Sequence, residues 1–148
     1  MALHCPHSMT SMAGFFNNLS MEKLDHLGDV YSPGVEFQDP LHHTRGLPAL
    51  RRMYEQLLNQ LQDVTVTVSD IHGDDSTGFL LWTMRYKLRG KEGVITGTSH
   101  LRFAADGRVA TQHDHWDASF PVYGEFPLIG WLMRRIKRKI AITSTDGR

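Results

Sequence analysis

Apolar and polar residues alternate along the second half of the chain, which predicts β-strands there. Residues 64–72 alternate as VTVTVSDIH, and residues 79–89 alternate as well. One face of the second stretch carries large apolar side chains: Leu80, Trp82, Met84, Tyr86 and Leu88. Turns at 73–75 and 90–93 lead from each stretch to the next, so we predict an antiparallel meander that continues over 94–103.

Residues 96–117, which read TGTSHLRFAADGRVATQHDHWD, predict a β-hairpin. An Asp-Gly pair between two runs rich in β-branched and aromatic residues is a strong hairpin signal. Because side chains alternate across a strand, three residues share one face of each arm. They are Thr98, His100 and Arg102 on the first arm, and Gln112, Asp114 and Trp116 on the second. If both faces point inward, a histidine, a carboxylate and an indole converge.

The first half of the chain has the spacing of helices. Apolar residues over 12–19 predict a short first helix, and Ser20 caps a second one that ends at 32–34. A short strand follows over 35–38. Residues 46–62 form an apolar stripe at helical spacing and predict the longest helix. Helices followed by an antiparallel sheet indicate an α+β fold, in which a strongly curved sheet wraps around the long helix.

The charge is divided unevenly along the chain. Residues 1–126 hold 10 Lys and Arg against 15 Asp and Glu, whereas residues 127–148 hold 6 against 1. We therefore divide the chain into a domain over 8–120 and a C-terminal basic amphipathic helix and tail over 121–148. Such a helix either covers apolar protein surface or lies on a membrane. We expect it to dock on the protein, because a short helix gains most of its stability from packing.

Composition narrows the classes of function. A chain of 148 residues with 41% hydrophobic and 22% charged residues fits one soluble globular domain. A lone Cys5 and the absence of a secretory signal make the cytoplasm the expected compartment. The body has no basic stripe interleaved with aromatic residues, so we expect no nucleic-acid binding. Nine histidines show no tight ligand spacing, and we expect neither a metal nor a cofactor.

Several short motifs in a fixed order resemble the NTF2-like superfamily, in particular its SnoaL-like polyketide cyclases and ketosteroid isomerases. The motifs are FQDP at 37–40, Gly46 with the long helix after it, and SHLRF, DGRV and DHWD in the hairpin. The resemblance covers roughly residues 10–118. It implies a cone-shaped α+β barrel with a deep pocket, in a protein that is usually dimeric.

The resemblance also implies roles for individual residues. Asp39 matches the proton-shuttling carboxylate of the ketosteroid isomerases, but Phe15 stands where these enzymes have an oxyanion-stabilising tyrosine, and their protonated aspartate falls near Ser99. The spacing of 14 residues from His100 to Asp114 resembles the His and Asp pair of the SnoaL-like cyclases, whose aspartate is acid and base. This second match is the better one.

The candidate catalytic residues are therefore Asp114, His100 and Asp39. Apolar walls would raise the pKa of Asp114, although it could also be a buried structural carboxylate held by His100 or Arg102. Asp39 has a structural alternative too, as a turn residue that caps local backbone amides. The candidate ligand-binding residues are Trp116, Trp82, Tyr86, Gln112, Thr98 and Phe15.

The leading hypothesis is a protein that binds a small, largely apolar molecule and catalyses proton transfer, cyclisation or hydration. The alternatives are a non-catalytic ligand-binding or scaffolding module of the same fold, and a peripheral membrane accessory protein. We also expect a homodimer formed through the face opposite His100, where Ile95, Leu101 and Phe103 would leave an apolar patch.

Overall fold

The computed structural model describes residues 7–119, 121 and 125–140. The chain forms two compact units, Met1–Trp116 and Asp117–Arg148. The first unit contains α1 (His7–Asn17), a 3-10 helix (Glu22–His26), α2 (Leu27–Val30), β1 (Tyr31–Gln38), β2 (His43–Arg45), α3 (Leu47–Gln60), β3 (Gln62–Gly73), β4 (Thr77–Leu88), β5 (Lys91–Phe103) and β6 (Val109–Trp116). The second unit contains α4 (Pro127–Ile140).

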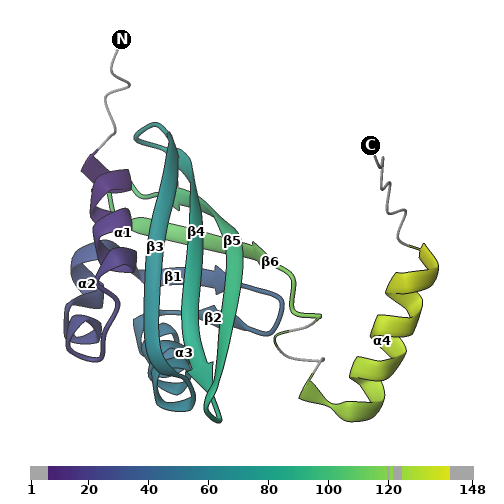
Figure 1. Ribbon diagram of the computed structural model, residues 1–148. Helices are drawn as coiled ribbons and strands as arrows, with labels where there is room; N and C mark the ends of the chain where they lie inside the picture. Colours follow the sequence, from purple (N-terminus) through teal and green to yellow (C-terminus); the bar gives the residue numbers. More distant parts are fainter. Residues whose placement is uncertain (1–6, 120, 122–124, 141–148) are drawn as a thin grey trace. The chain divides into compact units, whose positions relative to one another are not determined.

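Six strands form one curved, open sheet in the order β2-β1-β6-β5-β4-β3 (Figure 1). Neighbouring strands are antiparallel except for β1 and β6, which run parallel. The predicted α+β class is therefore confirmed. The short strand expected over 35–38 begins earlier, at Tyr31, and β2 was not predicted.

Helix α3 begins after Gly46, whose φ of 85° is a conformation that glycine adopts without strain. Pro48 fits the first turn of a helix, where the backbone N–H has no partner within the helix. The side chains that α3 buries are Leu50, Met53 and Tyr54, at the spacing of one helix face. Helix α3 packs against β1, β2 and β3, while α1 packs against β3 (Figure 1). Both helices therefore help to cover the apolar face of the sheet.

The register of the hairpin formed by β5 and β6 corrects the predicted faces. Phe103 pairs with Val109 but Arg102 pairs with Thr111, so Ala110 is an extra residue in a bulge. A shift of one residue changes which side chains of β5 lie on the same face of the sheet as a given side chain of β6. Beyond the bulge, Ser99 lies opposite Asp114 instead of His100 or Thr98.

The prediction that Thr98, His100 and Arg102 share the inward face with Asp114 is therefore wrong. The inward residues of β5 are Ile95, Gly97, Ser99 and Leu101, all of them buried.

The predicted dimer face is wrong for the same reason. Ile95 and Leu101 belong to the core, with 8% and 0% of their surfaces exposed. The apolar residues on the outer face of the sheet are instead Phe79, Leu81 and Val94, which are 47%, 42% and 51% exposed. The homodimer itself stays a prediction.

Candidate functional site

Asp114 lies on the inner face of β6 and is 8% exposed. Its Oδ1 atom accepts two hydrogen bonds, from the Ser99 hydroxyl on β5 at 2.5 Å and from Nε2 of Gln112 at 2.9 Å. Ser99 Oγ in turn accepts a hydrogen bond from the Trp82 indole on β4 at 2.9 Å. Three adjacent strands thus direct polar side chains to one carboxyl group.

Two tyrosines continue this arrangement beyond Gln112. The Tyr31 hydroxyl at the start of β1 donates to Oε1 of Gln112 at 2.7 Å. Because the Tyr31 proton is used in that bond, the Tyr54 hydroxyl on α3 is the donor in its 2.9 Å bond to Tyr31. We call the connected residues the Asp114 network: Tyr54, Tyr31, Gln112, Asp114, Ser99 and Trp82. Every donor in the network leads toward Asp114, which is its final acceptor.

Burial raises the pKa of Asp114 to about 7. Hydrogen bonds from Ser99 and Gln112 favour the ionised form and oppose this rise, whereas the negative charge of Asp39 adds to it. Both protonation states are therefore populated near neutral pH. Burial also raises the pKa of Tyr31 and of Tyr54, so both hydroxyls remain protonated donors.

The second oxygen of Asp114 differs from the first. Within the described part of the chain, Oδ2 receives no hydrogen bond. Among the described residues, the only fully buried side-chain polar atoms without a hydrogen-bond partner belong to Ser32 and Thr44. Oδ2 also has no partner but is not one of these fully buried atoms, so it retains some accessible surface. A carboxyl group with one oxygen held by the protein and the other unbound is suited to exchange a proton with a ligand.

Several predicted ligand-binding residues lie in the same interior. Trp82 and Tyr86 are buried on β4, with 6% and 9% exposed. The Phe15 ring on α1 stands edge-on to the rings of Tyr31 and Tyr54, each at 5.7 Å between centroids. Trp116 is partly buried and packs against the core. Gln112 belongs to the Asp114 network, whereas Thr98 lies on the outer face of β5 and takes no part in it.

His100 also lies on the outer face, so its predicted meeting with Asp114 is wrong. It is opposite His113 in the sheet and stacks on the ring of Phe79, with centroids 4.6 Å apart. Its Nε2 atom is 3.2 Å from the Thr77 hydroxyl.

Asp39 stands in the turn after β1, where local groups occupy its carboxylate. Oδ1 accepts hydrogen bonds from the backbone N–H groups of Leu41 at 2.7 Å and His42 at 2.6 Å. The His42 ring nitrogen Nδ1 lies 3.0 Å from the same oxygen. These bonds are those expected of a turn-capping aspartate. Asp39 therefore acts on Asp114 through its charge, and a catalytic role for it stays a prediction.

The candidate residues predicted from the sequence did not include Ser99, Tyr31 or Tyr54, although the resemblance placed the protonated aspartate of the ketosteroid isomerases near Ser99. The two tyrosines counted as apolar positions of helix stripes, although Tyr31 begins a strand. A signal for Ser99 was present, because it alternates with Ile95 and Leu101, and an apolar face interrupted by one hydroxyl often marks a buried polar group.

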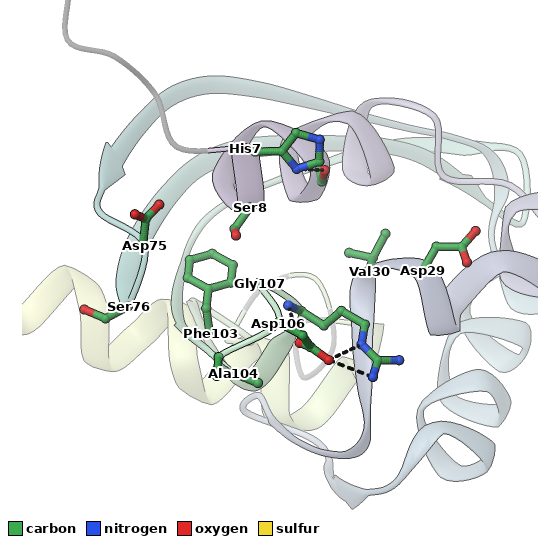
Figure 2. Close-up of a pocket in the computed structure, with 13 residues that line it drawn as sticks. His7, Ser8, Asp29, Val30, Asp75, Ser76, Phe103, Ala104, Asp106 and Gly107 are labelled. Atoms are coloured by element: carbon green, nitrogen blue, oxygen red, sulfur yellow. Dashed lines mark hydrogen bonds and ion pairs between the residues drawn. The ribbon is translucent and has the colours of Figure 1, made fainter.

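No cluster of three or more potential metal ligands occurs among the residues that the structure describes. A polar cleft of about 590 Å³ lies between the first turn of α1, α2 and two strand turns, and its lining includes no residue of the Asp114 network. Figure 2 shows this cleft. Asp106 and Arg108, which both line it, form an ion pair. The deep apolar pocket expected beside Asp114 stays a prediction.

Comparisons with known proteins agree with the fold. A family model described as a SnoaL-like domain matches residues 12–112. No curated protein matches. One similar solved structure is an NTF2-like protein of unknown function from Burkholderia pseudomallei K96243, with 14% identity, 79% of this chain and 95% of that chain covered, and a TM-score of 0.71.

Two further solved structures show the breadth of this fold. A LEH-like epoxide hydrolase from M. tuberculosis is 13% identical, with 90% of this chain and 95% of that chain covered and a TM-score of 0.63. A protein of ketosteroid isomerase-like fold from Catenulispora acidiphila DSM 44928, in complex with trimethylamine, is 13% identical, with 78% and 88% covered and a TM-score of 0.66. At such identities the similarity concerns the fold alone.

Proposed function

Because this chain belongs to the SnoaL-like domain family within the NTF2-like fold, we propose that it binds a small, largely apolar molecule beside Asp114 and transfers a proton to or from it. The observation that supports this proposal most strongly is the state of Asp114. The carboxyl group of Asp114 lies inside an apolar core, and burial raises its pKa to about 7. Its Oδ2 atom receives no hydrogen bond from the described residues.

The proposed chemistry needs only this carboxyl group. Ionised Asp114 takes a proton through Oδ2 from a carbon beside a carbonyl group, or from a water molecule that attacks the ligand. The protonated form then returns the proton to another atom of the same molecule. An acid whose pKa lies near the working pH serves both steps. Ser99 and Gln112 would hold Oδ1 in place during both steps.

The substrate class follows from the donors that the site can offer. The hydroxyls of Tyr54, Tyr31 and Ser99 already donate within the network, and Phe15 has no donor. Stabilisation of a strongly basic oxyanion is therefore limited among these residues. This favours substrates whose C–H bond is already acidic, such as activated ketones and 1,3-dicarbonyl compounds. No cofactor is needed for such a reaction.

The pH dependence of proton exchange tests this proposal. We expect the protein to accelerate deuterium exchange at the activated carbon of 2-tetralone, measured by proton NMR in deuterated buffer. Because the base must be ionised, kcat/KM should rise with pH and level off above about 7, the pKa of Asp114. A profile that is flat between about pH 5.5 and 8.5 would show that another group is the base.

A non-catalytic binding or scaffolding module is the second candidate. The supporting observation is the completeness of the hydrogen bonding from Tyr54 to Oδ1 of Asp114, which is also typical of a structural network. In that case 2-tetralone would bind without faster exchange. The same assay therefore separates the two candidates.

A further inference from the structure

Helix α4 carries an apolar stripe whose side chains are largely exposed. At 3.6 residues per turn, the stripe occupies about 100° of the helix circumference. It consists of Ile129, Leu132, Met133, Ile136 and Ile140. Four of these side chains are 45%, 49%, 47% and 73% exposed, namely Ile129, Leu132, Ile136 and Ile140. An amphipathic helix with such a stripe requires an apolar partner to gain most of its stability.

Most of the cations of α4 lie on the rest of the helix surface, together with the exposed side chains of Leu128 and Trp131. Five cations, Arg134, Arg135, Lys137, Arg138 and Lys139, occur within 14 residues that contain no acidic side chain. By helical spacing, Arg135 and Lys139 flank one edge of the stripe and Lys137 flanks the other. The guanidinium carbon of Arg135 also lies 5.3 Å from the centre of a Trp131 ring. Positive charge thus borders the apolar stripe on both sides.

We propose that α4 binds to the surface of lipid bilayers that contain anionic headgroups. The helix lies in the plane of the interface, with its stripe against the acyl chains and its cations among the headgroups. At 14 residues the helix is about 21 Å long, which is shorter than the roughly 30 Å apolar layer of a bilayer. In agreement with this, no helix in the described part of the chain is long and apolar enough to cross a membrane.

The uniformly positive charge of α4 favours a membrane over a protein as its binding partner. A surface rich in anionic lipid presents one sign of charge along both edges of the stripe, whereas a protein groove normally presents both signs. The lack of any acidic residue in α4 matches the first surface better. The sequence alone had favoured docking on the protein. Since residues 1–126 are acidic overall, docking on them is the competing outcome that an experiment has to exclude.

Vesicle flotation with the full chain tests the proposal. We expect binding to vesicles of phosphatidylcholine with about 30% phosphatidylserine, and binding at least about tenfold weaker to pure phosphatidylcholine. Raising NaCl from about 0.1 M to about 0.5 M should weaken binding by a similar factor, because salt screens the cations. Ile136→Glu places a charge in the centre of the stripe and should reduce binding at least about tenfold.

A matched control removes an exposed apolar side chain elsewhere. Leu81→Glu changes an outer-face residue of β4 that is 42% exposed and should leave vesicle binding unchanged. Equal losses in Leu81→Glu and Ile136→Glu would overturn the assignment to α4, as would failure of the unchanged protein to float with anionic vesicles. A lower melting temperature of Ile136→Glu with unaltered flotation would show that the stripe docks on protein.

Discussion

Asp114→Asn should lower turnover of the proposed proton transfer by about two to four orders of magnitude, the usual contribution of a general base. Asparagine keeps the shape of the side chain, and its carbonyl oxygen can still accept the hydrogen bonds from Ser99 and Gln112. It cannot take up a proton. Affinity for the ligand should therefore change little while kcat falls, which the deuterium exchange of 2-tetralone would measure.

The control for this prediction is a substitution of His100, which was predicted to lie beside Asp114 but lies on the outer face of the sheet. His100→Gln removes a titratable group from the outer face of β5, where it stacks on Phe79. We expect its turnover to stay within about twofold of the unchanged protein, since outer-face substitutions rarely affect an interior site. If His100→Gln lost as much activity as Asp114→Asn, the catalytic group would lie on the outer face of the sheet instead.

The same Asp114→Asn substitution should make the protein more stable at alkaline pH, by about 2–4 kcal/mol in the free energy of unfolding. The folded-state pKa of about 7 lies above the pKa of 3.8 that an unperturbed aspartate has. Below about pH 4 Asp114 is protonated in both states, and its contribution to stability is fully present. As the pH rises further, the unfolded chain releases the proton first, and stability falls until the folded pKa is passed.

Asparagine carries no such pH dependence. Urea unfolding of both proteins at about pH 5 and pH 8 should therefore show a difference that grows with pH in favour of Asp114→Asn. A variant that is less stable at pH 8, or a difference independent of pH, would mean that Asp114 is ionised without penalty in the folded protein. A substitution that raises stability and lowers turnover is typical of an active-site residue.

Periodicity was sufficient to predict most of the fold. The alternation over 79–89 and the stripe over 46–62 appear as β4 and α3 because each pattern buries one continuous apolar face. The β2 strand was missed because three residues at the edge of a sheet carry no readable period. Tyr31 was assigned to a helix because it continues an apolar pattern at helical spacing. The same residue also suits the first position of a strand, which is where the structure has it.

The candidate site was predictable only in part. The alternation of its own strand predicts that Asp114 faces inward. Its partner on β5, however, depends on a bulge at Ala110, which no local sequence pattern predicts. One extra residue brought Ser99 to the carboxyl group and took His100 away. Tyr54 reaches the network through tertiary packing, as residues 31 and 54 meet only when α3 lies against β1.

The most direct test is a carbon-13 NMR titration of the aspartate carboxyl groups, with Asp114→Asn used to assign the resonance of Asp114. We predict one resonance with a midpoint near pH 7, absent from the variant, because burial disfavours the charged form. A midpoint for Asp114 below about pH 5 would contradict the account, since the carboxylate would then be ionised throughout the neutral range and unable to return a proton.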